Sequence, residues 1–116
     1  VSFGRGLWSQ LVEFFNRLSE QGPVIIINDI AYMDYAFDWR NATDYLSCFN
    51  SMSENMAVLM AFSCSKLLTA YGMRLGALVI LSRRREDVDA LACSCVRYAR
   101  SCWGNANNGR IGPKQE

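Results

Sequence analysis

The spacing of hydrophobic positions changes along the chain, and each spacing predicts a different element. A first apolar stripe recurs at helical intervals: Leu7, Leu11, Val12, Phe15 and Leu18. This stripe predicts an amphipathic helix near residues 7–20, which Gly22-Pro23 ends. The run Val24–Ile27 is then apolar and β-branched throughout, a pattern typical of a strand buried on both faces in a parallel sheet.

The rest of the chain predicts two more strands and two more helices. Met56–Phe62 and Leu75–Leu81 are the second and third strands. Tyr45, Leu46, Phe49 and Met52 suit a short helix between the first two strands, starting near Asn41 or Thr43. A last helix would be capped by Ser82 and has the apolar positions Val88, Leu91, Ala92, Cys95, Val96 and Ala99. Arg83, Arg84 and Arg85 would lie in its first turn, an unfavourable end for cations, and are expected on a solvated surface.

The alternation of helix and buried strand predicts an α/β fold. Three strands leave two open apolar edges, which normally need more strands or a cover, so the chain is expected to be a fragment of a larger sheet. The first residue, Val1, is not an initiator Met, which points the same way. From Gly104 onward the sequence is polar and rich in Gly and Asn, and this tail is expected to fray.

Composition narrows the class of protein. A hydrophobic content of 51% excludes a disordered chain, and a net charge of +1 gives no attraction to nucleic acid or acidic membranes. The longest apolar runs are too short to span a bilayer, and the first residues do not resemble a signal peptide, so a cytoplasmic protein is expected. The five cysteines are odd in number and lack paired spacing, which predicts buried reduced thiols and no metal site. Because the chain has no histidine, Ser-His-Asp and Cys-His catalysis are excluded.

Polar residues gather after the first two predicted strands. Asp29 and Tyr32 follow the first strand, and Ser63, Ser65 and Lys66 follow the second. Ligands of open α/β sheets bind at the carboxyl ends of the strands. A carboxylate, a phenol, hydroxyls and an amine, with Arg74 close behind, suit an anionic cofactor that carries a carbonyl group.

Each of these residues has an ordinary structural alternative when taken singly. Asp29 would be a turn residue at a strand end, Tyr32 a half-buried packing residue, and Lys66 a solvated surface lysine. The joint spacing favours the functional interpretation, because all three alternatives would have to hold at once.

Two motifs together resemble a known family. Asp29-Ile30-Ala31-Tyr32, and Ser63-Cys64-Ser65-Lys66 continuing to Gly-Met-Arg-Leu-Gly at residues 72–76, resemble the class I/II aminotransferases of pyridoxal-phosphate (PLP) fold type I, and most closely the bacterial aspartate/aromatic aminotransferase-like proteins. The likeness runs from about Leu7 to Asn108. It implies part of the family's large domain over residues 1–108, with about three buried strands, two parallel and the third antiparallel, and a disordered polar tail over residues 109–116.

The resemblance implies roles for three of these residues. Lys66 would form the internal Schiff base (aldimine) with the cofactor aldehyde and, once freed, would move a proton between Cα and C4′. Asp29 would pair with the pyridine nitrogen and keep it protonated, which makes the ring an electron sink. Tyr32 would donate a hydrogen bond to the phenolic oxygen of the ring.

The phosphate would be held by the residues around the lysine. Arg74 would grip it with its planar guanidinium, and Ser63 and Ser65 would add hydroxyl contacts. Gly72 could supply a left-handed turn and Gly76 a close backbone approach, although both could be ordinary turn glycines.

The likeness also covers the end of the last helix. Arg100 and Asn105 resemble the segment that meets the substrate's distal carboxylate in the neighbouring subunit's site, so a homodimer is implied. Arg100 could equally be a cation that complements the helix dipole. The implied function is amino group transfer between an amino acid and a 2-oxo acid. A truncated or degenerate non-catalytic PLP-binding domain, and a PLP lyase or acyltransferase of the same fold, remain alternatives.

Overall fold

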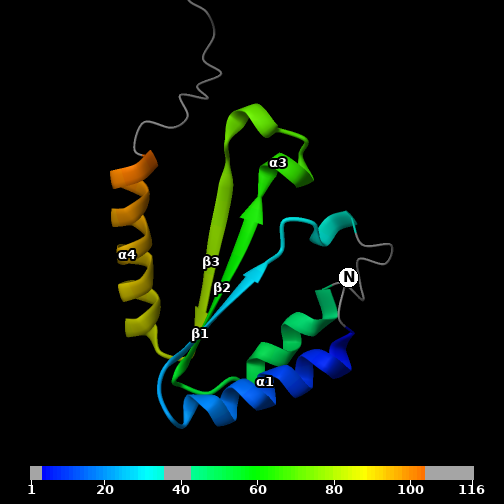
Figure 1. The fold of residues 1–116 in the computed structure, drawn as a ribbon, viewed down its shortest axis with the longest axis vertical. Helices are drawn as coiled ribbons and strands as arrows, with labels where there is room; N and C mark the ends of the chain where they lie inside the picture. Colours follow the sequence, from blue (N-terminus) through cyan, green and yellow to red (C-terminus); the bar gives the residue numbers. More distant parts are fainter. Residues whose placement is uncertain (1–3, 36–42, 104–116) are drawn as a thin grey trace, which may run out of the picture.

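A computed structural model of the protein describes residues 4–35 and 43–103. The chain begins with helix α1 (Arg5–Ser19), strand β1 (Val24–Asp29) and a 3-10 turn, η1 (Met33–Tyr35). A longer 3-10 segment, η2 (Tyr45–Ser51), leads into β2 (Met56–Ser63). The short helix α3 (Cys64–Leu67) and the turn η3 (Tyr71–Met73) precede β3 (Gly76–Ser82) and the final helix α4 (Arg85–Trp103) (Figure 1). Within the described ranges, no helix is long and apolar enough to cross a membrane.

The three strands of the described residues form one mixed sheet in the order β1-β2-β3. β1 runs parallel to β2, with Ile26 opposite Val58, and β2 runs antiparallel to β3, with Val58 opposite Leu81. The predicted α/β class and the predicted strand directions are therefore confirmed. The third strand begins at Gly76, one residue after the predicted start at Leu75.

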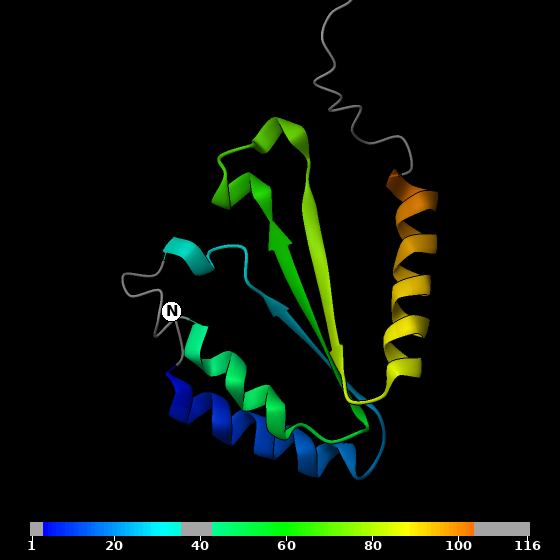
Figure 2. The ribbon, with the colours of Figure 1, turned by 180° about the vertical axis from the view of Figure 1, so that it is seen from behind.

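One face of the sheet carries the hydrophobic core. α1 and η2 lie side by side and pack against this face (Figure 2). Trp8 of α1 stacks on Tyr45 of η2, with ring centroids 4.7 Å apart. The buried core residues come from α1, from η2 and the residue after it, and from β2: Val12, Tyr45, Cys48, Phe49, Met52, Met56, Val58 and Met60. The buried valine, methionine and phenylalanine side chains among them each stabilise the fold by roughly 1.5–3 kcal/mol relative to exposure.

The opposite face of the sheet is open at β1 in the described part of the chain. Ile25 and Ile27 of β1 are 55% and 73% exposed, whereas Ala57 of β2, on the same face, is buried. The prediction that the first strand is buried on both faces is therefore wrong for these residues. The reason is that the described α1 and η2 cover one face, while the described α4 contacts β3.

The short and the last helices differ in detail from the predictions. The segment around Tyr45 is mostly 3-10 helix, with Thr43 already helical and Asp44 at the cap position of η2. Asn41 lies outside the described residues. The Ser82 hydroxyl accepts a hydrogen bond from the Arg84 N–H (3.2 Å) just before α4 begins, which agrees with the predicted capping role.

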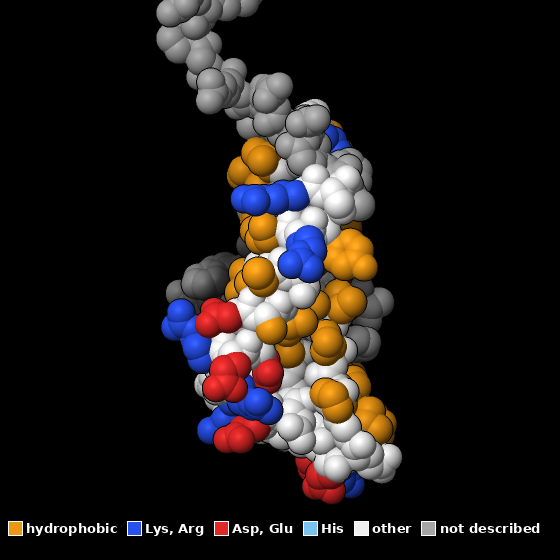
Figure 3. All heavy atoms as spheres, turned by 90° about the vertical axis from the view of Figure 1, so that its left-hand side faces the viewer, with side chains coloured by type: hydrophobic (Ala, Val, Ile, Leu, Met, Phe, Trp, Pro, Cys, Tyr) orange, Lys and Arg blue, Asp and Glu red, His pale blue; other side chains and the backbone are white. Residues whose placement is uncertain are grey.

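Of the three arginines predicted in the first turn, Arg85 begins α4, whereas Arg83 and Arg84 precede it. Arg84 and Arg85 have acidic partners close in sequence. Arg84 lies 3.4 Å from Glu86 and 3.7 Å from Asp87, and Arg85 lies 3.4 Å from Asp89. Seen from the α4 side, acidic and basic side chains gather at the N-terminal end of this helix (Figure 3). The (i, i+3) pair of Arg84 with Asp87 and the (i, i+4) pair of Arg85 with Asp89 contribute about 0.2–0.5 kcal/mol each, which offsets part of the unfavourable placement of cations at a helix N-terminus.

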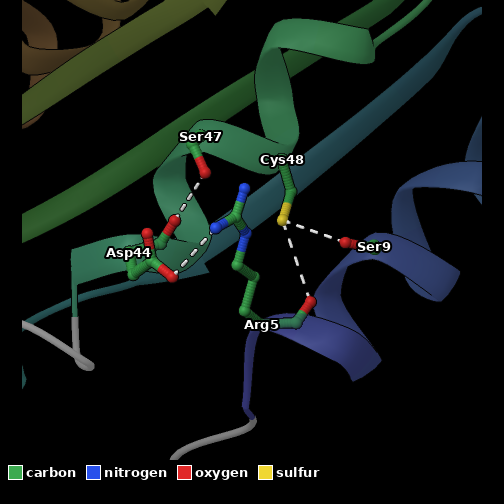
Figure 4. A network of polar contacts seen from close by, with 5 residues as sticks. All are labelled: Arg5, Ser9, Asp44, Ser47 and Cys48. Atoms are coloured by element: carbon green, nitrogen blue, oxygen red, sulfur yellow. Dashed lines mark hydrogen bonds and ion pairs between the residues drawn. The ribbon is translucent and has the colours of Figure 1, made fainter.

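A small polar network fastens the start of α1 to η2 (Figure 4). Arg5 pairs with the Asp44 carboxylate at 3.3 Å, and Ser47 donates to the Asp44 carbonyl at 2.7 Å. The buried Cys48 lies 3.3 Å from the Ser9 hydroxyl and donates weakly to the Arg5 carbonyl at 3.8 Å. This network accounts for Cys48 as a structural thiol.

The other described cysteines do not all follow the prediction of burial. Cys64 and Cys95 are half-buried and Cys93 is exposed, and each is a free thiol. Cys93 is exposed because it lies on the side of α4 that faces away from β3, where the described chain offers nothing to cover it.

Candidate functional site

The carboxyl ends of β1 and β2 lie together because the two strands are parallel neighbours. Asp29, the last residue of β1, is opposite Ala61 of β2, and Ser63 lies two residues further along the same face. Ser63 is in turn opposite Gly76, the first residue of β3. Residues distant in sequence therefore meet at one edge of the sheet, where α/β folds bind ligands.

Asp29 makes the turn that leads away from this edge. Its exposed carboxylate accepts a hydrogen bond from the Ala31 N–H at 3.0 Å, and the Ile30 N–H donates to the Ala61 carbonyl at 2.9 Å. The aspartate thus has the strand-end turn role that was its structural alternative. The same turn directs the chain so that Tyr32 lies next to Lys66.

Lys66 lies in α3, and its amine lies near two tyrosine rings that come from other parts of the chain. The amine nitrogen is 5.5 Å from the centre of the Tyr32 ring and 4.9 Å from the centre of the Tyr71 ring. The Tyr32 hydroxyl, and after it that of Tyr71, raises the pKa of the Lys66 amine above its ordinary value, while partial desolvation opposes them. The free chain therefore holds this amine in its charged form, and a proton must leave before the nitrogen can attack a carbonyl.

Tyr35 supports the lysine from the backbone side. Its hydroxyl donates a hydrogen bond to the Lys66 carbonyl at 2.5 Å, and its ring lies 6.2 Å from that of Tyr32. Neither Tyr35 nor Tyr71 was among the predicted site residues. The available signals were the spacing of three between Tyr32 and Tyr35, which aligns two side chains in a 3-10 turn, and the place of Tyr71 inside the run that carries the lysine.

The backbone between Lys66 and β3 is tightly constrained. The Cys64 N–H donates to the Leu75 carbonyl at 3.1 Å and so closes the base of the loop. A side chain at Gly76 would bring its Cβ to 2.8 Å from the Phe62 carbonyl oxygen, so the predicted close approach is confirmed. The prediction for Gly72 is wrong, since it does not adopt a positive φ; Thr69 (φ 50°) and Arg74 (φ 51°) do so instead.

The predicted phosphate-binding residues have different environments. Ser63 occupies the cap position of α3, but its side chain makes no capping hydrogen bond. Ser65 is only 7% exposed, whereas the Arg74 side chain is exposed. The structure therefore leaves Ser63 and Arg74 more accessible to a ligand than Ser65.

Of the two predicted substrate-binding residues, Arg100 lies on α4 and not on the elements that form this edge. Arg100 is an exposed residue in the last turn of α4, where it also complements the helix dipole. That turn points toward the same end of the molecule as α3 (Figure 1). Asn105 lies outside the described residues.

The fold and this edge define a class of protein: an α/β domain with an accessible lysine at the carboxyl ends of parallel strands. The chain belongs to the class I and II aminotransferase family, whose sequence model matches residues 8–101. It is also similar to the crystal structure of an aminotransferase from Anaerococcus prevotii DSM 20548, with a TM-score of 0.85, 31% identity and 90% of this chain covered. The chain spans 26% of the length of that structure. A comparison with curated proteins finds no match.

Proposed function

We propose that this chain is the cofactor-holding part of a PLP-dependent aminotransferase, in which Lys66 binds the cofactor covalently. The observation that carries the proposal is that the Lys66 amine nitrogen lies 5.5 Å from the centre of the Tyr32 ring. The two residues follow the carboxyl ends of parallel strands, and the chain is a member of this family. PLP is the cofactor that the family implies.

The chemistry of the side chains at this edge fits such a cofactor. An aldehyde needs a primary amine, a pyridine nitrogen needs a carboxylate, and a phosphate needs hydroxyls and a guanidinium. Lys66, Asp29, Ser63 and Arg74 offer these groups, and Tyr32 offers a phenol to the ring's oxygen. When bound, PLP would supply an electron sink for the bond-breaking steps at the substrate's Cα.

The protein side chains would have distinct tasks. Lys66 would act first as the nucleophile that captures the aldehyde and later as the base that moves a proton at Cα. Asp29 would hold a proton on the pyridine nitrogen while its Oδ1 atom keeps the turn at Ala31. Arg74, with Ser63 and more weakly the buried Ser65, would neutralise the phosphate.

The whole protein would transfer an amino group from an amino acid to a 2-oxo acid. We propose that it acts in the cytoplasm, in amino acid metabolism, as a homodimer with the site near the subunit interface. Arg100 and Asn105 would meet the distal carboxylate of the substrate there. These proposals rest on the family, because the chain spans 26% of the related structure.

The test is covalent capture of PLP at Lys66. The primary amines of the chain are those of Lys66, Lys114 and the N-terminus, and they lie in separate stretches of the sequence, so digestion distinguishes them. After incubation with PLP, reduction with borohydride and digestion, mass spectrometry should find the cofactor on the Lys66 peptide. Visible absorption before reduction, retained after washing, should report the same adduct.

Two matched variants decide the outcome. Lys66→Ala should abolish the absorption band and the labelled peptide, whereas Lys114→Ala should keep both. Equal labelling of the two variants would contradict the proposal. Capture at Lys66 without any amino transfer by the whole protein would favour the non-catalytic alternative, and release of a cleaved or acylated product would favour the lyase or acyltransferase.

A further inference from the structure

The loop after the lysine brings one more aromatic residue to the site. Tyr71 follows Lys66 by five positions, and on a continuous helix residues three and four apart face each other, whereas residues five apart do not. α3 ends at Leu67, and Thr69 then takes a left-handed φ of 50° before η3 begins. This break in the helix is what lets the Tyr71 ring return to within 4.9 Å of the Lys66 amine.

Tyr71 contributes little to the core, so packing does not explain its position. Its side chain is 56% exposed, and it lies outside the cluster of buried residues under α1 and η2. The turn that carries it ends at Arg74, a second left-handed residue, with φ 51°. A left-handed backbone conformation is unfavourable for residues other than glycine, and such residues concentrate at functional sites. Thr69 and Arg74, on either side of this turn, both adopt it.

We propose that Tyr71 is a positioning residue for the Lys66 amine, holding it beside Tyr32 at the carboxyl edge of the sheet. This inference rests on the proposed function, because it assigns Tyr71 to the lysine that captures the cofactor. The face of a tyrosine ring attracts a cation within about 6 Å of its centre, and both rings lie inside that limit. The amine nitrogen is therefore restrained before any ligand arrives, on the side of the sheet where Asp29 and Ser63 lie.

The groups around the amine come from three places in the fold. Tyr32 comes from the turn after β1, Tyr35 from η1 and Tyr71 from η3. Tyr35 binds the Lys66 carbonyl, so its hydroxyl acts on the backbone and not on the amine. Tyr32 and Tyr71 are the groups that raise the pKa of the amine, which is the direction expected if both contacts favour its charged form.

The pH profile of Lys66 acylation tests this role without using PLP. Acetic anhydride modifies neutral amines, so the fraction of Lys66 acetylated against pH reports where the amine loses its proton. Tyr71→Leu should lower the midpoint by roughly half a pH unit, which is about a threefold faster labelling below the midpoint. Lys114, measured in the same digest, gives an internal reference.

Further variants separate positioning from a general structural effect. Tyr71→Trp should restore the midpoint, because the indole face binds cations best, and Tyr71→Phe should lie between Leu and the native residue. Tyr98→Leu, a substitution of a 74% exposed tyrosine on α4, should leave the midpoint unchanged. A midpoint that stays the same in Tyr71→Leu, or that Trp fails to restore, would overturn the proposal.

The outcome is distinguishable from failure of the proposed function. If Tyr71→Leu shifts the acylation profile but PLP does not attach to Lys66, the positioning role stands and the cofactor assignment fails. If PLP attaches to Lys66 but the profile is unchanged, the cofactor assignment stands and the role of Tyr71 fails.

Discussion

The covered face of the sheet and the loop after β2 are stabilised by different kinds of interaction. On the covered face, Met56 and Val58 are 1% and 0% exposed and are surrounded by apolar side chains from α1 and η2. In the loop, Tyr71 is half exposed and the backbone at Thr69 and Arg74 is left-handed. The first region is held by burial, and the second by its closed base and by contacts among a few polar and aromatic groups.

This difference separates residues that stabilise the fold from residues whose side chains can reach a ligand. A buried methionine or valine has no access to a ligand and contributes stability alone. Lys66, Asp29 and Arg74 contribute little burial, so their functional groups remain available for chemistry. Residues that bind ligands are commonly placed on loops that a rigid scaffold supports, as here.

The largest effect is expected when a charge is placed on each face of the sheet in turn. Val58→Lys should unfold the chain, because an unpaired ammonium group would be buried among apolar side chains, at a cost above about 4 kcal/mol. Ile27→Lys, on the open face, should keep the fold and reduce self-association through the exposed strand. Circular dichroism and light scattering measure both effects, and an unfolded Ile27→Lys chain would mean that the open face is needed for stability.

A methyl group added at each of two glycines should have opposite effects on stability. Gly76→Ala should lower the free energy of unfolding by about 1–3 kcal/mol, because its Cβ would lie 2.8 Å from the Phe62 carbonyl oxygen. Gly72→Ala meets no atom within 4 Å and has no positive φ, so it should change stability by less than about 1 kcal/mol, in the stabilising direction. Denaturant titration of the two variants gives the comparison, and equal losses would argue against the close approach at Gly76.

The smallest effect is expected at the left-handed threonine. Thr69→Gly removes the conformational cost of a positive φ at a β-branched residue but adds flexibility to the unfolded chain, so a gain of up to about 1 kcal/mol is expected. Thermal unfolding measures this gain. A clear loss of stability would show that the Thr69 side chain, whose hydroxyl donates to the Leu68 carbonyl at 2.8 Å, matters more than its backbone strain.

Much of the fold was predictable because its signals are local. The helical stripe ending at Leu18 and the β-branched run at Val24–Ile27 gave α1 and β1 within a few residues, and Met56–Phe62 gave β2. The alternating exposure of β1 was not predictable, since an apolar run shows which residues avoid water but not which neighbours cover them. The 3-10 form of η2 was missed for a related reason, because its apolar positions fit either helical type.

Only part of the candidate site could be predicted from the sequence. Lys66, Tyr32 and Asp29 could be selected from motif spacing, but Tyr35 and Tyr71 could not, since their contacts with Lys66 depend on two turns outside regular helix or strand. Gly72 was assigned the left-handed conformation on residue type, whereas the chain places that conformation at Arg74 and Thr69. Both residues lie in the loop that the hydrogen bond between Cys64 and Leu75 closes, and no local propensity predicts their angles.

The sequence by itself determined the class of fold, the strand segments and the family, because these depend on hydrophobic period and on a joint motif that includes Lys66 and Arg74. The tertiary structure decided which face of the sheet is covered, that Ser65 is buried while Lys66 remains accessible, and that Tyr71 lies against the amine. The physical reason is that hydrophobic patterning acts within one segment. Exposure, amine protonation and left-handed turns depend on what separate segments bring to the same place.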